Sequence, residues 1–234
     1  MEHYVGVKSV SDQKIMAADR LLGAVNSLWR THGRDQMSAR LVAQNAHAQA
    51  SQINYYFGSF EQMLCSAQAD AIAQAILWCD ETLSRFGRFD AGTLPPEALG
   101  HMLAALIDDW CRGQADLAFA WTECQMLAAR NPDFIDARRQ WHGLWVRFWD
   151  EVAERTGMTA QAELLRLFFN GESFLHRIRW RETFDRACLS ETCVAWARAL
   201  RDGEAGAGPL RDHARRETQR FAAPVLVDGS VHAR

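Results

Sequence analysis

Apolar residues recur at helical spacing along almost the whole sequence, and this pattern constrains the fold more than any other feature. Within residues 12–32, positions spaced alternately by three and four are apolar: Ile15, Ala18, Leu22, Val25 and Trp29. Such spacing is typical of one face of an amphipathic helix. No segment alternates convincingly between apolar and polar residues, as a half-buried strand would. We therefore predict an all-α fold.

Capping and helix-breaking residues divide this pattern into separate helices. Gly33 suits the end of the first helix. Ser38 is a good N-cap, and Ser59 begins a long helix in which Gln62, three positions later, would complete a capping box. Beyond the first helix, we expect helices at about residues 38–46, 50–56, 59–86, 95–110, 115–130, 133–156, 159–181, 188–202 and 209–222.

The helices group into three regions. Residues 1–58 contain three helices, the last two short and joined by a tight turn, which is the outline of a helix-turn-helix. Residues 59–202 form a larger helical bundle. Residues 203–234 begin with the sequence GEAGAG, whose composition predicts a linker followed by a partly flexible tail.

Charge is distributed unevenly, although the net charge is only −3. Residues 1–58 carry six Lys or Arg and four Asp or Glu, whereas the remainder carries 20 basic and 25 acidic residues. A slightly basic head on an acidic body suits a protein whose head meets phosphates. Such asymmetry also arises by chance, so it is only one part of the argument.

Several classes of protein are disfavoured. The sequence has neither a basic segment followed by an apolar leader nor a run of about 18 apolar residues, so we expect a cytoplasmic chain without a membrane partner. The six cysteines form no CxxC pair, and none lies near a His at zinc spacing, so we expect reduced thiols, no metal and no cofactor. No HExxH, GxSxG, Walker or Rossmann motif is present, which argues against an enzyme.

Three consecutive aromatic residues, Tyr55, Tyr56 and Phe57, lie at the end of the third helix. Successive helical residues are turned by about 100°, so the three rings cannot share one face and at least one must point outward. Tyrosine has a polar hydroxyl and is the better outward residue. We expect Phe57 to pack inward and Tyr55, with Tyr56, to face a polar partner.

The stretch SARLVAQNAHAQASQINYYFGSFEQML resembles the DNA-binding region of TetR-type transcriptional regulators, with the likeness strongest over about residues 12–64. It has a Ser opening the second helix, an Ala-rich segment before the turn, and a recognition helix that ends in Ile-Asn-Tyr-Tyr-Phe. Gly-Ser-Phe-Glu then opens the long fourth helix. The resemblance implies a dimer that binds a double-stranded DNA operator through these helices.

The side chains suited to DNA contact divide by chemistry. Polar groups on the third helix that reach base edges, with a small residue for close approach, are Gln49, Ala50, Ser51, Gln52 and Asn54. The resemblance implies phosphate contacts from Ser38, Arg40, Tyr55, Tyr56 and Ser59. Ile53 and Phe57 would pack beneath the helix.

Three positions depart from the family pattern. His47 replaces the usual turn glycine, but His is among the residues that tolerate positive φ. Asn54 replaces a frequent Tyr. Phe60 stands where the family often has a lysine that meets a phosphate, so one expected backbone contact is missing.

Eight of the nine tryptophans lie beyond residue 77, in the helical body. Tryptophans are equally suited to a core, to a dimer interface and to a pocket for a flat or apolar effector. Our candidates for contacting such a small molecule are His101, Met102, Trp110, Trp121, Met126, His142, Trp145, Phe174 and His176. For each one, a place in the core or on the surface is the simpler alternative.

The resemblance further implies that the helices at about 133–156 and 159–181 form a homodimer interface, with Gly171 allowing close helix approach. The predicted function is a ligand-responsive transcriptional repressor that binds a palindromic operator and is released by an apolar or aromatic effector. Two alternatives remain from the residues: a helical sensor of a small molecule or protein partner that does not bind DNA, and an uncharacterised all-helical enzyme. A redox regulator using Cys65 or Cys79 has little support, since neither has a flanking basic residue.

Overall fold

A computed structural model describes residues 10–87, 94–178 and 186–201, and in these ranges the regular structure is entirely helical. The predicted all-α class is therefore confirmed. No described helix is long and apolar enough to cross a membrane. The expected linker and tail at 203–234, with the helix at 209–222, lie outside the described residues.

The head consists of α1 (Val10–His32), α2 (Ala39–Asn45) and α3 (Ala50–Phe57). Val25 and Trp29 of the expected α1 stripe are buried. One turn earlier, the buried residue is Leu21, and the expected Leu22 is half-buried. Val42 of α2 and Ile53 of α3 are also fully buried. The head core is thus built from one side of each helix.

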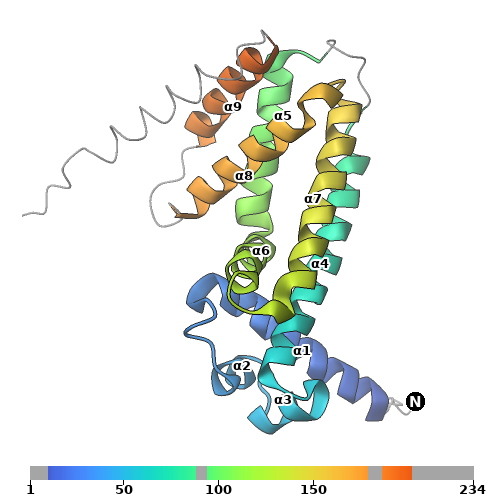
Figure 1. Ribbon diagram of the computed structural model, residues 1–234, viewed down its shortest axis with the longest axis vertical. Coiled ribbons are helices and arrows are strands. Elements are labelled where there is room, and N and C mark those ends of the chain that lie inside the picture. The colour runs from blue at the N-terminus through green and yellow to red at the C-terminus, as the bar shows by residue number, and fades with distance from the viewer. Residues whose placement is uncertain (1–9, 88–93, 179–185, 202–234) are drawn as a thin grey trace, which may run out of the picture.

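The body begins with the long helix α4 (Phe60–Ser84). It continues through α5 (Pro96–Asp108), α6 (Ala115–Ala128), α7 (Ile135–Arg155), α8 (Ala162–Ile178) and α9 (Arg186–Arg201). Helices α4 and α7 lie side by side, and α9 packs along α5 (Figure 1). The last approach is close, because a Cβ on Gly100 would lie 2.4 Å from the Val194 Cα atom, so only glycine fits there.

Short helices of other types lie at the junctions between the helices that the sequence predicted. The stripe that passes from α5 to Trp110 enters a π-helix at Asp109–Gly113 (η1). One turn of 3-10 helix precedes α7 (Pro132–Phe134, η2), and another precedes α8 (Thr159–Gln161, η3). Apolar spacing does not distinguish these tighter or wider turns from α-helix, so the sequence did not locate them.

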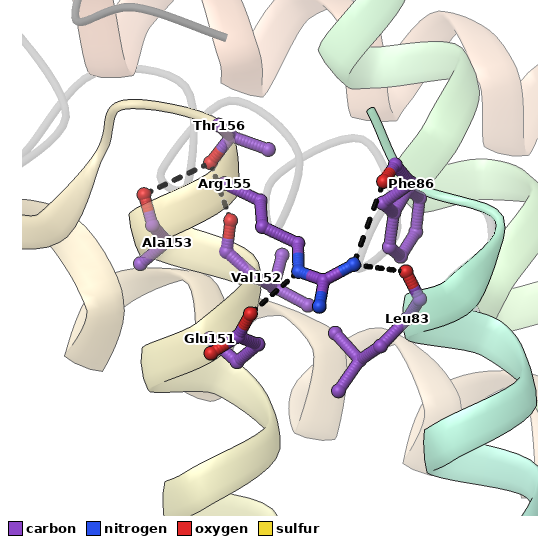
Figure 2. A network of polar contacts seen from close by, with 7 residues as sticks. All are labelled: Leu83, Phe86, Glu151, Val152, Ala153, Arg155 and Thr156. Carbon is purple, nitrogen blue, oxygen red and sulfur yellow. Dashed lines mark hydrogen bonds and ion pairs between the residues drawn. The ribbon is translucent and has the colours of Figure 1, made fainter. Parts of the chain in front are cut away.

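Polar contacts near the middle and at the C-terminal end of α4 fix it to neighbouring helices of the body. Near its middle, the buried Gln68 side chain donates from Nε2 to the Ala120 carbonyl of α6 and accepts from Trp141 Nε1 of α7, both at 3.0 Å. At its C-terminal end, Arg155 of α7 reaches the Leu83 carbonyl and lies 3.5 Å from the Phe86 carbonyl (Figure 2). The arginine satisfies carbonyl groups at a helix terminus, where cations are favoured.

The Arg155 guanidinium is itself held in place. Its Nε donates to Glu151 Oε1 at 2.6 Å, one turn earlier on α7 (Figure 2). The next residue, Thr156, is buried and donates its hydroxyl to the Val152 carbonyl at 2.8 Å. Arg155 of α7 therefore helps to position the end of α4, in addition to the backbone cap that Arg85 provides.

Candidate nucleic-acid interface

The turn between α2 and α3 has the geometry of a helix C-cap that usually requires glycine. His47 has a φ of +50°, in the left-handed region. The Ala48 amide donates to the Ala43 carbonyl at 2.8 Å, and the His47 amide donates to the Gln44 carbonyl at 3.2 Å. This pair of bonds is a Schellman motif. The histidine thus maintains the tight turn at the position where the sequence departs from the family pattern.

Helix α2 begins at the predicted N-cap. The Ser38 hydroxyl accepts from the Leu41 amide at 3.2 Å, in extended backbone geometry. Arg40, in the first turn, is exposed. Ser38 and Arg40 therefore lie together at one end of α2, with the Ser38 Oγ engaged as a cap.

Helix α3 presents most of its predicted DNA-contacting side chains to solvent. Ile53 is buried, whereas the exposed side chains are Gln49, Ala50, Ser51, Asn54 and Tyr55. Gln52 differs, since it is half-buried and its Oε1 accepts from the Gln49 amide at 3.0 Å. The structure thus places Gln52 in the cap of α3 and leaves the other polar candidates on one open surface.

The three consecutive rings divide by exposure. Tyr55 is 64% exposed, while Tyr56 and Phe57 are partly buried and pack against the core. The Tyr55 and Tyr56 rings meet edge to face, with centroids 4.9 Å apart. Tyr55 is therefore the ring that faces fully outward, and Tyr56 is intermediate.

In the body, the structure brings together three of the predicted effector-contacting residues. Trp110 and Trp145 are buried and meet edge to face at 4.9 Å, and the half-buried Trp121 lies 6.1 Å from Trp145. We did not single out Trp78 from the sequence, yet it packs 5.1 Å from Trp110 and donates from Nε1 to Asp109 Oδ2 at 2.7 Å. Only the general enrichment of tryptophan in the body hinted at this aromatic cluster.

The remaining candidates lie apart from that cluster. Met126 and Phe174 are 54% and 50% exposed, and Met102 is half-buried against the core. His142 is exposed, and so is His101, whose Nδ1 lies 2.7 Å from Ser190 Oγ. The side chain of His176 is outside the described part.

No protein-family model matches the sequence, and no curated protein matches it either. Solved structures do match. A transcriptional regulator from Rhodococcus sp. Rha1 superposes with a TM-score of 0.61 and 18% identity, covering 82% of this chain and 99% of that chain. A TetR-family member from Streptomyces coelicolor A3 has a TM-score of 0.54 and 20% identity, covering 76% of this chain and 96% of that chain.

The chain has the fold of the TetR-family transcriptional regulators. The multidrug binding protein EbrR, solved in complex with ethidium, is also similar, with a TM-score of 0.51, 19% identity, and coverage of 76% of this chain and 97% of that chain. These identities are low, so the likeness concerns the fold. It covers both the head and the body.

Within this TetR-type head, the structure shows what surrounds Phe60. The Arg34 guanidinium lies over the Phe60 ring, with Cζ 5.1 Å from the ring centroid, and pairs with Glu61. A cation therefore lies beside the start of α4, although Phe60 replaces the lysine that is frequent there in the family. The Arg34 amide also donates to Glu123 Oε2 of α6 at 3.3 Å, which connects this corner of the head to the body.

Four of the six cysteines are poorly suited to redox sensing. Burial raises the pKa of the Cys79 and Cys124 thiols to about 12, and it raises the pKa of Cys193 further. Burial, together with the charges of Asp133 and Glu61, also raises the pKa of Cys65. Since the thiolate is the reactive form, these groups are weak nucleophiles at neutral pH.

Proposed function

We propose that the chain is a ligand-responsive transcriptional repressor, which binds a palindromic operator as a homodimer in the cytoplasm and is released by an apolar or aromatic small molecule. The observation that carries the proposal is the exposed surface of α3, set beside a tight Schellman turn and the start of α2. A short helix held in this way suits insertion into a major groove.

The DNA contacts follow from what each exposed side chain offers. Gln49 and Asn54 carry amides that form bidentate bonds with adenine, and Ser51 bonds to several bases. Tyr55 and Arg40 lie outside this set and are suited to phosphates, which fix the register of the protein on the duplex. The Arg34 guanidinium would supply a further cation near the start of α4.

The homodimer would form through α8. Its exposed apolar side chains are Leu164, Leu167 and Phe174, which are 39%, 56% and 50% exposed. Gly171 falls on the same stripe, and a Cβ there would meet no described atom within 4 Å, which leaves room for a partner helix. An exposed apolar face of this kind favours burial in an interface. A two-fold axis would set the two α3 helices about 34–36 Å apart, one turn of DNA.

The effector would enter the aromatic cluster of the body. Among the described residues, the buried indole N–H groups of Trp110, Trp145 and Trp149 have no hydrogen-bond partner. Each buried donor left unpaired costs about 1–3 kcal/mol. A flat ligand with an acceptor atom would relieve that cost while stacking on the rings. The effector would bind one conformation of the body more tightly than another. This difference in binding free energy, typically about 1–3 kcal/mol, would be the amount by which the effector weakens operator binding.

The decisive experiment is selection of bound fragments from random DNA at low salt, followed by affinity measurement on the recovered motif. We expect a palindromic motif. Tyr55→Phe, which removes only the hydroxyl, should weaken binding about tenfold or more, because a hydrogen bond to a charged group contributes about 1.5–3 kcal/mol. Arg40→Ala should weaken binding and reduce the salt dependence by about one ion per half-site.

Arg139→Ala is the matched control, because Arg139 is an exposed arginine on α7, in the body. It should leave both the affinity and its salt dependence unchanged. If the wild-type protein recovers no motif at low salt, the operator-binding proposal fails, and a helical sensor that does not bind DNA becomes the better description.

The dimer is tested separately by light scattering after size exclusion. Leu167→Glu places a charge in the proposed interface and should convert a dimer into a monomer with unchanged helix content. Met126→Glu is the control, since Met126 is equally exposed on α6. A wild-type monomer at micromolar concentration would contradict this part of the proposal.

A further inference from the structure

A polar cleft lies where the head meets the body. It has a volume of about 340 Å³, and its walls come from α1 of the head, α4, the π-helix η1 and the first turn of α6. This volume lies within the range of small-molecule sites. The cleft is distinct from the aromatic cluster, because it is lined mainly by polar side chains and by two glycines, Gly23 and Gly113.

Gly23 has no packing reason to be a glycine. It lies in the middle of α1, where glycine costs about 1 kcal/mol of helix stability relative to alanine. A Cβ added at this position would meet no described atom within 4 Å. A larger residue would instead change the cleft, because Gly23 forms part of the cleft wall. A side chain much larger than that of alanine at this position would therefore occupy the cleft.

Asn26, one turn further along α1, contributes an unpaired acceptor to the same wall. The residue is only 5% exposed, and its Nδ2 donates to Asp70 Oδ2 at 2.9 Å. Gln74 Nε2 donates to that same carboxylate oxygen at 2.7 Å. Asn26 Oδ1 has no hydrogen-bond partner in the described part of the chain. A buried acceptor in this state favours a ligand with an N–H or O–H donor.

The remaining wall carries two arginines and one carboxylate, that of Asp116. Arg30 and Arg112 line the cleft, and α6 begins there after Gln114, whose side chain makes no capping bond. Arg30 Nη1 lies 3.6 Å from Asp116 Oδ1, and Arg112 pairs with Asp108. The Arg30 guanidinium has five N–H donors, so its contact with one carboxylate does not exhaust it. Together with the positive end of α6, these groups favour an oxyanion.

We propose that this cleft is a binding site for a small polar anion, a carboxylate or phosphate that also carries hydroxyl or amino groups. The oxyanion would lie between Arg30, Arg112 and the start of α6, and a ligand donor would pair with Asn26 Oδ1. The π-helix supports a functional role, because such turns occur frequently at functional sites. Because the walls belong to both head and body, the ligand would bridge the two.

The test is calorimetry and thermal shift on the full chain with two hydroxylated anions, citrate and glucose 6-phosphate. Glucose serves as the uncharged comparison and spermidine as the cationic one. We expect at least one anion to bind the wild-type protein and to raise its Tm, while glucose and spermidine do not. The two anions also separate a carboxylate preference from a phosphate preference.

Gly23→Phe and Gly23→Ala form the matched pair of variants. The alanine should bind as the wild type does, with a slightly more stable helix, while the phenylalanine fills the cleft and should weaken binding at least about tenfold. Arg30→Gln provides a second variant, in case Gly23→Phe does not fold, and should weaken only the anions. Equal binding by the phenylalanine and alanine variants would overturn the proposal, as would equal binding of glucose.

Binding of neither anion at about 10 mM would also overturn it. Since none of these measurements uses DNA, a protein that binds its operator but neither anion would contradict the cleft alone.

Discussion

Replacing Gln68 tests how firmly α4 is held to the body. Gln68 is fully buried, and its amide joins three helices through the Ala120 carbonyl of α6 and the Trp141 indole of α7. Gln68→Leu keeps a similar volume but removes both hydrogen bonds. It leaves the buried Trp141 indole donor without a partner, at about 1–3 kcal/mol, and it also removes the bond to the Ala120 carbonyl, which keeps its helical partner within α6 and so contributes only about 0.5–1.5 kcal/mol. After a partial gain from the apolar side chain, we expect a loss of about 1–4 kcal/mol.

For a chain of this length, 1 kcal/mol corresponds to roughly 2–4 °C in Tm, so the expected fall is about 2–16 °C. Urea unfolding followed by circular dichroism gives the free energy directly. Gln140→Leu is the control, because Gln140 is exposed on α7 and should change stability by less than about 0.5 kcal/mol.

A double-mutant cycle separates the hydrogen bond from the loss of packing. Trp141→Phe removes the indole donor, so combining it with Gln68→Leu should cost less than the sum of the two single changes, by about 0.5–3 kcal/mol. Additive effects, or a Gln68→Leu protein as stable as the wild type, would refute the view that this amide ties α4 to α6 and α7.

Three further changes test other contacts. His47→Gly should raise the free energy of unfolding by up to about 1–2 kcal/mol, because glycine adopts the left-handed backbone conformation without strain. His47→Val should lower the free energy of unfolding, and a stabilising valine would contradict the turn geometry. Burial raises the pKa of Glu123, so the folded state holds its proton more tightly than the unfolded state, and stability should fall as pH rises from about 4.5 through the raised pKa. Glu123→Gln should therefore raise Tm at pH 7, with the gain shrinking toward pH 4.5, and a constant gain would argue against titration. Iodoacetamide should label Cys79 and Cys124 in the native protein far more slowly than in urea, as mass spectrometry of the modified peptides would show.

The helix-turn-helix could be predicted because its signals are local. Ser38 and Ser59 cap the helices that follow them, and each bond spans three residues. His47 adopts the positive φ that its place in the pattern demanded. The division of the three rings also follows from helical geometry, which turned Tyr55 outward. Gln52 was harder to place, because its side chain bonds to the Gln49 amide instead of remaining open.

The body was less predictable because its contacts join residues distant in sequence. An apolar stripe identifies a helix but does not say what that helix packs against. Trp110 and Trp145 meet in the cluster, whereas Met126 and Phe174, chosen on the same grounds, remain exposed. That Phe174 meets a second copy, and that Met126 meets an effector, both stay predictions.

The amino-acid sequence by itself determined the helical class, the order of the helices and the head motif, since caps, breakers and apolar periodicity act within a few residues. Only the tertiary structure decided which buried polar groups find partners. Trp141 has Gln68, Trp78 has Asp109, and Asn26 Oδ1 has no described partner. It also revealed a cleft beside Gly23, where the sequence alone shows an unremarkable glycine. The physical reason is that pairing and empty space depend on how helices meet, and helices that meet are separated by tens of residues along the chain.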